Sequence, residues 1–193
     1  MGDAAPKPYV SFEEYEALEE KSPERQEWLD GVVYDMSGGT IGHSKLQANI
    51  IRRLGNQLEG TRCDVHTADL KIRVLATGLG TYPDVSVICG PPERDPQSKT
   101  AVTNPTVLVE VLSDSSEAYD RGEKFAHYRR IPSLREYVLV SQNQRRIEVF
   151  RKNEEGFWVL VAEASDGESA TLASIGCTLR VDEVYANVRL ESE

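Results

Sequence analysis

Three charged side chains in the middle of this chain, Asp84, Glu110 and Lys124, stand on or beside apolar segments. Glu110 is the single charged residue between Thr106 and Leu112, a run that is typical of a buried strand. A carboxylate there is costly to bury unless it is paired, hydrogen-bonded or bound to a metal. Two strand carboxylates that meet at one edge of a sheet suit Mg²⁺ or Mn²⁺, and a nearby lysine can offset charge on a phosphate. This combination is the chemistry of metal-dependent phosphodiester hydrolysis.

Each of these residues also has a purely structural interpretation. Asp84 follows a proline, and Pro-Asp is common in turns. Glu110 can form an ion pair with a buried arginine. Lys124 can form an exposed i,i+4 pair with Asp120 on a helix face that it shares with Tyr128. The helix directly follows the Glu110 strand, and this favours a place for Lys124 at the end of that strand.

Two further residues are candidates for the same site. Glu27 stands beside Trp28 and Leu29 in a predicted hairpin and can complete the metal shell, or it can simply face solvent. His43 lies near the start of a predicted helix and can touch the phosphate or a water molecule. The alternative for His43 is a hydrogen-bonded structural residue.

Other chemistries find little support in the sequence. It contains no GxGxxG, P-loop, GxSxG or HExxH motif. Its three cysteines, Cys63, Cys89 and Cys177, are an odd number without CxxC spacing. This predicts neither a disulfide framework nor a zinc site, and favours buried reduced thiols.

The composition predicts one ordinary globular domain over residues 1–193, with residues 1–10 disordered. The net charge of −10 disfavours non-specific coating of nucleic acid, which relies on many basic contacts to phosphate. No stretch is long enough to span a membrane and no signal pattern is present, so we expect no membrane partner and a cytoplasmic location. Three arginine pairs can form a basic rim, or can be ordinary solvated surface: Arg52-Arg53, Arg129-Arg130 and Arg145-Arg146.

The order of predicted elements is mixed, which is typical of an α/β fold with a mixed central β-sheet flanked by helices. A polar, proline-rich segment over 90–104 is predicted to be a mobile excursion. The other predicted elements are a capping-box helix from Ser11 to about Glu20, a hairpin over 26–36 turning at Asp30-Gly31, an amphipathic helix over about 41–59, one or two strands over 63–75, strands over 82–88 and 106–112, a helix over about 118–130, a strand over 134–140, a hairpin of 145–150 and 157–162, and a short helix over 181–185.

Taken together in this order, the motifs resemble those of the Uma-two-type restriction endonuclease family, a branch of the PD-(D/E)XK nuclease superfamily. The resemblance covers roughly residues 11–184. It is carried by Gln-Glu-Trp-Leu-Asp-Gly around Glu27, Met36-Ser37, His43, Tyr82-Pro83-Asp84-Val85-Ser86, Val109-Glu110-Val111-Leu112-Ser113, Asp120, Lys124, Tyr128 and Arg135-Glu136-Tyr137-Val138.

The resemblance implies the restriction-endonuclease-like fold and a divalent metal, with Asp84 and Glu110 as its ligands. The superfamily's lysine normally lies two residues after the acidic residue on the same strand, where this chain has Leu112. In this family a lysine from the following helix replaces it, which here implies Lys124.

The sequence therefore predicts a Mg²⁺- or Mn²⁺-dependent DNA endonuclease. Asp84 and Glu110 would hold the metal, Glu27 would join directly or through water, and Lys124 and His43 would serve the chemistry. The rival prediction is a non-catalytic module that binds nucleic acid or protein and retains the fold. A homodimer is also expected, because the resemblance suggests it and the strand 157–161 is apolar, although that strand can instead be internal.

Overall fold

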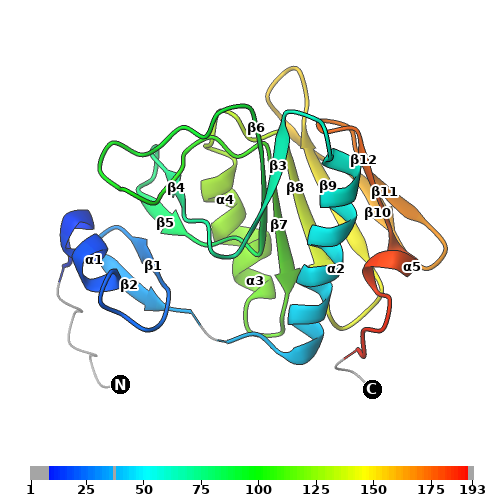
Figure 1. The fold of residues 1–193 in the computed structure, drawn as a ribbon, viewed down its shortest axis with the longest axis horizontal. Helices are drawn as coiled ribbons and strands as arrows, with labels where there is room; N and C mark the ends of the chain where they lie inside the picture. Colours follow the sequence, from blue (N-terminus) through cyan, green and yellow to red (C-terminus); the bar gives the residue numbers. More distant parts are fainter. Residues whose placement is uncertain (1–8, 37, 191–193) are drawn as a thin grey trace.

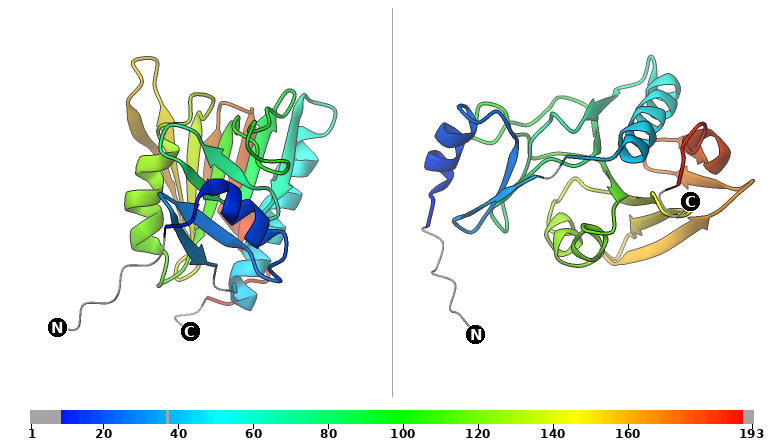
Figure 2. Two further views of the ribbon diagram at one scale, coloured as in Figure 1. Left: turned by 90° about the vertical axis from the view of Figure 1, so that its left-hand side faces the viewer. Right: turned by 90° about the horizontal axis from the view of Figure 1, so that it is seen from below.

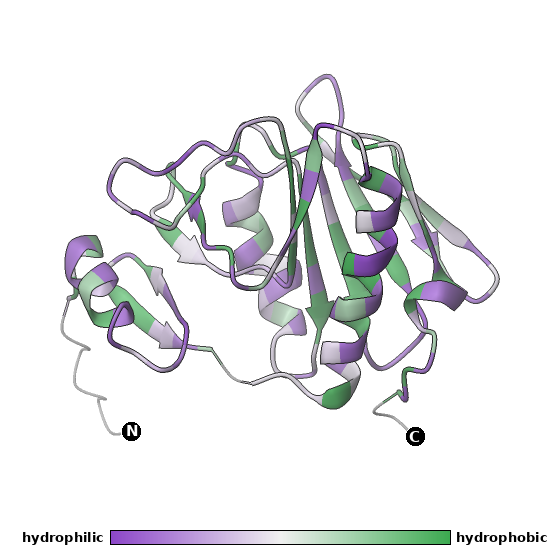
Figure 3. Ribbon diagram, in the orientation of Figure 1, coloured by the Kyte–Doolittle hydropathy of each residue, from purple (hydrophilic) through white to green (hydrophobic). Residues whose placement is uncertain are grey.

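A six-stranded mixed sheet forms the centre of the computed structural model, which describes residues 9–36 and 38–190 (Figure 1). The strand order is β10-β9-β8-β7-β6-β3, and β7 and β8 run parallel while the other neighbours are antiparallel. The central strands are buried along their whole length, as the apolar runs predict, and Figure 3 shows them as largely hydrophobic. The strands are β3 (Cys63–Thr67), β6 (Val85–Cys89), β7 (Val107–Leu112), β8 (Glu136–Ser141), β9 (Ile147–Lys152) and β10 (Trp158–Ala164).

Helices cover both faces of this sheet, and Figure 2 shows them on opposite sides. On one face lies α2 (Ile41–Leu58), which begins at the capping residue Thr40 and buries Leu46, Ile50 and Leu54 against the strands. The hairpin of β11 (Ser169–Leu172) and β12 (Cys177–Arg180) and the short α5 (Val181–Val184) extend the same apolar cluster. The mixed sheet flanked by helices is therefore confirmed.

The other face is covered by one helical segment with an irregular turn in its middle. It consists of α3 (Glu117–Tyr119), a π-helical turn η1 (Asp120–Lys124) and α4 (Phe125–Tyr128). Phe125 and Tyr128 pack against Tyr137 of β8, with ring centroids 4.8 and 5.3 Å away. A π-helical turn rotates the residues that follow it, and such turns are frequent at functional sites.

A smaller sheet lies beside the first and carries the N-terminal part of the chain. Its order is β2-β1-β5-β4, with α1 (Phe12–Glu19) packed on it. The predicted capping box is present between Ser11 and Glu14, and the predicted turn places Asp30 and Gly31 at positive φ of 45° and 83°. The strands are β1 (Gln26–Leu29), β2 (Val32–Asp35), β4 (Ile72–Val74) and β5 (Leu79–Thr81).

Three strands were not predicted: β5, β11 and β12 are three or four residues long and carry too little periodicity. The loop over 90–104 is also not a free excursion. Asp95 within it is buried and accepts a hydrogen bond from Arg73, and Val102 forms a bridge to Ile72. The predicted disorder falls mainly on residues 1–8, outside the described residues, while the Val10 amide donates to the carbonyl of Gly31.

The prediction of reduced thiols is wrong for two of the three cysteines. Cys63 and Cys89 form a disulfide, while Cys177 is free and buried. The antiparallel pairing of β3 with β6 places Cys63 directly opposite Cys89. The two residues are 26 positions apart, so the pairing of strands brings them together and no sequence spacing reveals it.

Candidate active site

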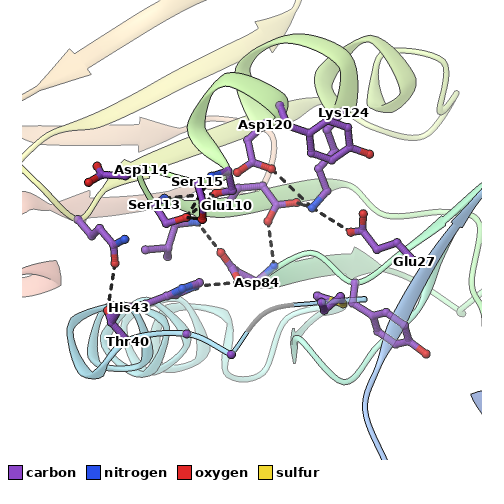
Figure 4. A pocket seen from close by; sticks show the side chains of 18 of the residues that line it. Glu27, Thr40, His43, Asp84, Glu110, Ser113, Asp114, Ser115, Asp120 and Lys124 are labelled. Atoms are coloured by element: carbon purple, nitrogen blue, oxygen red, sulfur yellow. Dashed lines mark hydrogen bonds and ion pairs between the residues drawn. The ribbon is translucent and has the colours of Figure 1, made fainter. Parts of the chain in front are cut away.

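All five predicted site residues line one cleft of about 400 Å³ (Figure 4). The central sheet presents Glu110 from the middle of β7, and Asp84 lies immediately before β6. The smaller sheet contributes Glu27 from β1, while α2 and the π-helical turn, on opposite sides of the cleft, carry His43 and Lys124. Glu27 and Lys124, which are 97 positions apart in the sequence, thus lie in the same cleft.

Asp84 accepts two hydrogen bonds through its carboxylate and lies beside His43. Its Oδ2 accepts a hydrogen bond of 2.6 Å from the amide of Val111, and its Oδ1 accepts one of 2.6 Å from the side chain of Gln47. His43 Nε2 lies 3.0 Å from the same Oδ1. Burial raises the pKa of Asp84, and the nearby His43 opposes that rise.

Glu110 is almost fully buried and has a lysine and a tyrosine as partners. Its Oε1 accepts a 2.7 Å hydrogen bond from the hydroxyl of Tyr128 and lies 3.0 Å from Lys124 Nζ. Its Oε2 accepts a 3.3 Å hydrogen bond from the backbone amide of Asp84, so the Glu110 carboxylate lies beside the residue that carries the other predicted ligand. Burial raises the pKa of Glu110 to about 8, although Lys124 acts in the opposite direction. The alternative of a buried arginine as the partner of Glu110 is therefore not what the structure shows.

Lys124 is buried at the centre of a carboxylate cluster. Besides Glu110, its Nζ lies 3.2 Å from Glu27 and 3.6 Å from Asp120. Burial by itself would lower the pKa of Lys124, but Glu110, Glu27 and Asp120 together raise it well above its ordinary value. The alternative of an exposed Asp120–Lys124 pair is not what the structure shows, because both side chains are buried.

Glu27 differs from its solvent-facing alternative, and His43 lies beside a predicted metal ligand. Glu27 is buried rather than solvent-facing, and one of its oxygens accepts a short hydrogen bond from the hydroxyl of Thr81. Figure 4 shows the Lys124 ammonium between the carboxylates of Glu110 and Glu27. His43 has Asp84 as its partner, which orients the carboxylate and the imidazole together.

The π-helical turn is anchored to the sheet at its beginning, by Asp120 and Arg121. Arg121 donates to both oxygens of Glu148 on β9, and the hydroxyl of Tyr137 donates to the carbonyl of Asp120 at 3.0 Å. Bidentate arginine–carboxylate pairs fix orientation as well as distance. The turn therefore places Lys124 over the end of the carboxylate pair on β6 and β7.

The donor set suits a hard divalent cation. Within residues 9–36 and 38–190, no three His, Cys, Asp or Glu side chains are arranged to hold a metal ion by themselves. Mg²⁺, however, commonly uses one or two carboxylates and completes its shell with water. Asp84 and Glu110 supply two carboxylates to the cleft, and three carboxylates of its described lining, Glu110, Glu27 and Asp120, surround one ammonium group. A cation would relieve this excess of buried negative charge.

Two residues that hydrogen-bond to the site carboxylates, and several residues of the cleft lining, were missed by the sequence analysis. Gln47 follows His43 by four residues, so helical spacing could have placed both on one face. No local pattern marks Thr81, because β5 was not recognised. The remainder of the described lining comes from β2, the start of α2, the segment after β7 and Gln142.

The arginine pairs do not contribute to the described lining of the cleft. Arg53 lies 3.5 Å from Glu183, and Arg145 pairs with Asp166 and Asp182. These contacts favour the interpretation of a solvated, charge-paired surface.

The mixed sheet, its flanking helices and the acidic pair on β6 and β7 define a restriction-endonuclease-like fold. A crystal structure described as a putative nuclease belonging to DUF820 from Anabaena variabilis shares this fold, with a TM-score of 0.68 over 86% of this chain and 94% of that chain. The two sequences are 14% identical, so this likeness concerns the fold alone.

The chain belongs to the Uma2 family, whose description is "Putative restriction endonuclease" and whose model matches residues 12–182. "Uncharacterized protein slr1290" of Synechocystis sp. is 42% identical over 183 residues, which is 94% of each chain. "Uncharacterized protein sll1609" of the same organism is 33% identical over 76% of this chain and 83% of its own length. Within the described residues, none of the helices has the length and apolar character needed to cross a membrane.

Proposed function

We propose that this protein is a Mg²⁺- or Mn²⁺-dependent endonuclease that hydrolyses phosphodiester bonds in DNA. The observation that carries the proposal is that Asp84 and Glu110 line one cleft, where Lys124 Nζ lies 3.0 Å from Glu110. Hard oxygen donors beside an ammonium group suit the binding and hydrolysis of a phosphodiester. Membership of the Uma2 family supports the same conclusion.

In this proposal each side chain has a separate task. Asp84 and Glu110 would hold the metal, which when bound supplies a Lewis acid and an activated water. Glu27 would contribute through a water molecule, because the ammonium of Lys124 stands between it and Glu110. His43 keeps the Asp84 carboxylate oriented, and Lys124 favours the ionised form of Glu110 and offsets negative charge on the phosphate.

The test combines Mn²⁺ titration with a cleavage assay on DNA. Asp84→Asn and Glu110→Gln should each weaken Mn²⁺ binding by at least about tenfold and abolish cleavage, because each removes a ligand charge while keeping its shape. Glu163→Gln is the matched control, since Glu163 is a half-exposed carboxylate on β10. Unchanged Mn²⁺ binding in Asp84→Asn and Glu110→Gln would refute the metal site. Mn²⁺ binding without cleavage would favour the non-catalytic binding module instead.

The oligomer proposed for this enzyme is a homodimer formed through β10. This strand is at the edge of the six-stranded sheet, so the alternative that it is an internal strand is wrong. Phe157 and the strand residues Val159, Leu160 and Val161 are between 43% and 66% exposed. An unpaired edge with exposed apolar side chains is suited to pairing with a second copy. A monomeric mass by light scattering at micromolar concentration would refute the dimer.

The proposed location is the cytoplasm, where a DNA-cleaving enzyme would meet its substrate. Cell fractionation followed by immunodetection tests this, and recovery outside the cytoplasmic fraction would overturn it.

A further inference from the structure

The charge of the cleft limits how nucleic acid can approach it. Six described carboxylates line the cleft, and Lys124, the lysine among its described residues, is already engaged by three of them. The six are Glu27, Asp35, Asp84, Glu110, Asp114 and Asp120. Binding of duplex DNA draws most of its affinity from basic contacts to many phosphates. Such contacts are scarce here, so affinity for the strand must have another source.

The size of the cleft also limits which form of nucleic acid can enter it. A volume of about 400 Å³ is in the range of sites that enclose one small ligand, which corresponds to one nucleotide rather than a stacked duplex. Enzymes that enclose one nucleotide take it from a single strand or extrude it from the helix. A strand that is unpaired beside the scissile phosphate would therefore fit this cleft better than a stacked duplex.

Aromatic and apolar side chains at the same cleft provide contacts for such bases. Tyr34 of β2 lines the cleft, is 46% exposed, and stands opposite Glu27 in the pairing of β2 with β1. Tyr119 lines the cleft from α3. Ile41 at the start of α2 is 91% exposed and lines a neighbouring hollow that shares Gly39 and Thr40 with the cleft. Exposed rings stack on bases of any sequence, and apolar side chains can enter between neighbouring bases.

We propose that the cleft accepts a DNA strand that is unpaired at the scissile phosphate, with one base stacked on Tyr34. This inference rests on the proposed endonuclease function and specifies its substrate as single-stranded or locally unpaired DNA. Stacking on Tyr34, on the wall of the cleft next to Glu27, would place the phosphate of that nucleotide near the carboxylate pair.

The first test compares three substrates of identical sequence with Mn²⁺ present. These are a single strand, a fully paired duplex, and the duplex with a central bubble of mismatches. Cleavage of the single strand and of the bubble should be at least about tenfold faster than cleavage of the duplex, because the latter must first unstack a base. Equal or faster cleavage of the duplex would overturn the inference while leaving the endonuclease function intact. Absence of cleavage on all three would overturn both.

The second test measures stacking directly and does not depend on turnover. Single-stranded DNA containing 2-aminopurine is titrated with Ca²⁺-loaded protein, and the quenching of the probe reports stacking on an aromatic ring. Tyr34→Leu should weaken binding by about 5- to 150-fold, the range for loss of one base–aromatic contact, whereas Tyr34→Phe should bind like the unmodified protein. Tyr9→Leu is the control, because Tyr9 is 71% exposed and lies outside the described lining of the cleft. Unchanged affinity and quenching in Tyr34→Leu would refute the stacking contact.

Discussion

Replacement of Lys124 by methionine tests whether the buried charge cluster is both structural and functional. Methionine keeps the length of the side chain and removes the ammonium group that lies within 3.0 to 3.6 Å of Glu110, Glu27 and Asp120. The sequence alone suggested an exposed pair whose loss would change stability by less than about 1 kcal/mol. The structure shows both partners buried, so a larger effect is expected.

The magnitude follows from the distances. At an effective dielectric of 20, each of the three contacts contributes about 5 kcal/mol of Coulombic attraction, most of which offsets the desolvation of the buried charges. Removal of one partner from a buried ion pair costs about 3 to 5 kcal/mol, because the remaining charge stays uncompensated. We expect Lys124→Met to lower the free energy of unfolding by this amount at high pH.

The loss of unfolding free energy in Lys124→Met should be larger at high pH than at low pH. Burial raises the pKa of Glu110 to about 8. The protonated carboxyl therefore contributes stability that is fully present below the ordinary pKa of a glutamate and is lost as the pH rises to about 8. Lys124 limits that rise, so without it the pKa of Glu110 lies higher and the loss extends to higher pH. The destabilisation should therefore be at least about 1 kcal/mol smaller at pH about 6 than at pH about 9, since one pKa unit corresponds to about 1.4 kcal/mol.

The assay is urea unfolding followed by tryptophan fluorescence at both pH values, together with Mn²⁺ titration and DNA cleavage. Lys21→Met is the matched control, because Lys21 is exposed. If Lys124 also offsets charge in the reaction, cleavage should fall by about a hundredfold or more while Mn²⁺ still binds. A destabilisation below about 1 kcal/mol at both pH values would refute the buried cluster. Cleavage at the unmodified rate with metal bound would show that Lys124 takes no part in the chemistry.

Three further outcomes follow from the same geometry. Mn²⁺ should bind about tenfold more tightly at pH about 9 than at pH about 7, because Glu110, with a pKa of about 8, must lose its proton to become a ligand. Calorimetry that shows no such pH dependence of Mn²⁺ affinity would contradict the role of Glu110 as a ligand. Arg121→Lys keeps the charge but loses the bidentate contact to Glu148, so kcat should fall about tenfold with little change in KM or in Mn²⁺ affinity; a loss confined to stability would show that the pair does not position the site. Removal of the disulfide by Cys63→Ser with Cys89→Ser should lower the free energy of unfolding by about 3 to 4 kcal/mol, as its sequence separation of 26 implies, and equal urea midpoints with and without reductant would argue that the bond does not form in solution.

Much of the fold follows from local sequence signals. The capping box at Ser11, the Asp30-Gly31 turn and the helical spacing of Leu46, Ile50 and Leu54 each act over a few residues, so their outcome can be predicted without tertiary contacts. Glu110 could be singled out because a lone charge in an apolar strand must have a partner.

The identity of that partner depended on the tertiary structure alone. Lys124 is buried because the π-helical turn and the β1–β2 hairpin close over it, and neither contact is visible in the spacing of residues. The same holds for the disulfide, which requires β3 to pair with β6 in a register that brings Cys63 opposite Cys89. The sequence by itself determined which charged residues stand in or beside apolar segments, since the free-energy cost of burying a charge depends on the residue and its neighbours along the chain. Only the folded chain decided which charges meet, because Coulombic and hydrogen-bond energies depend on distances between segments that the sequence keeps far apart.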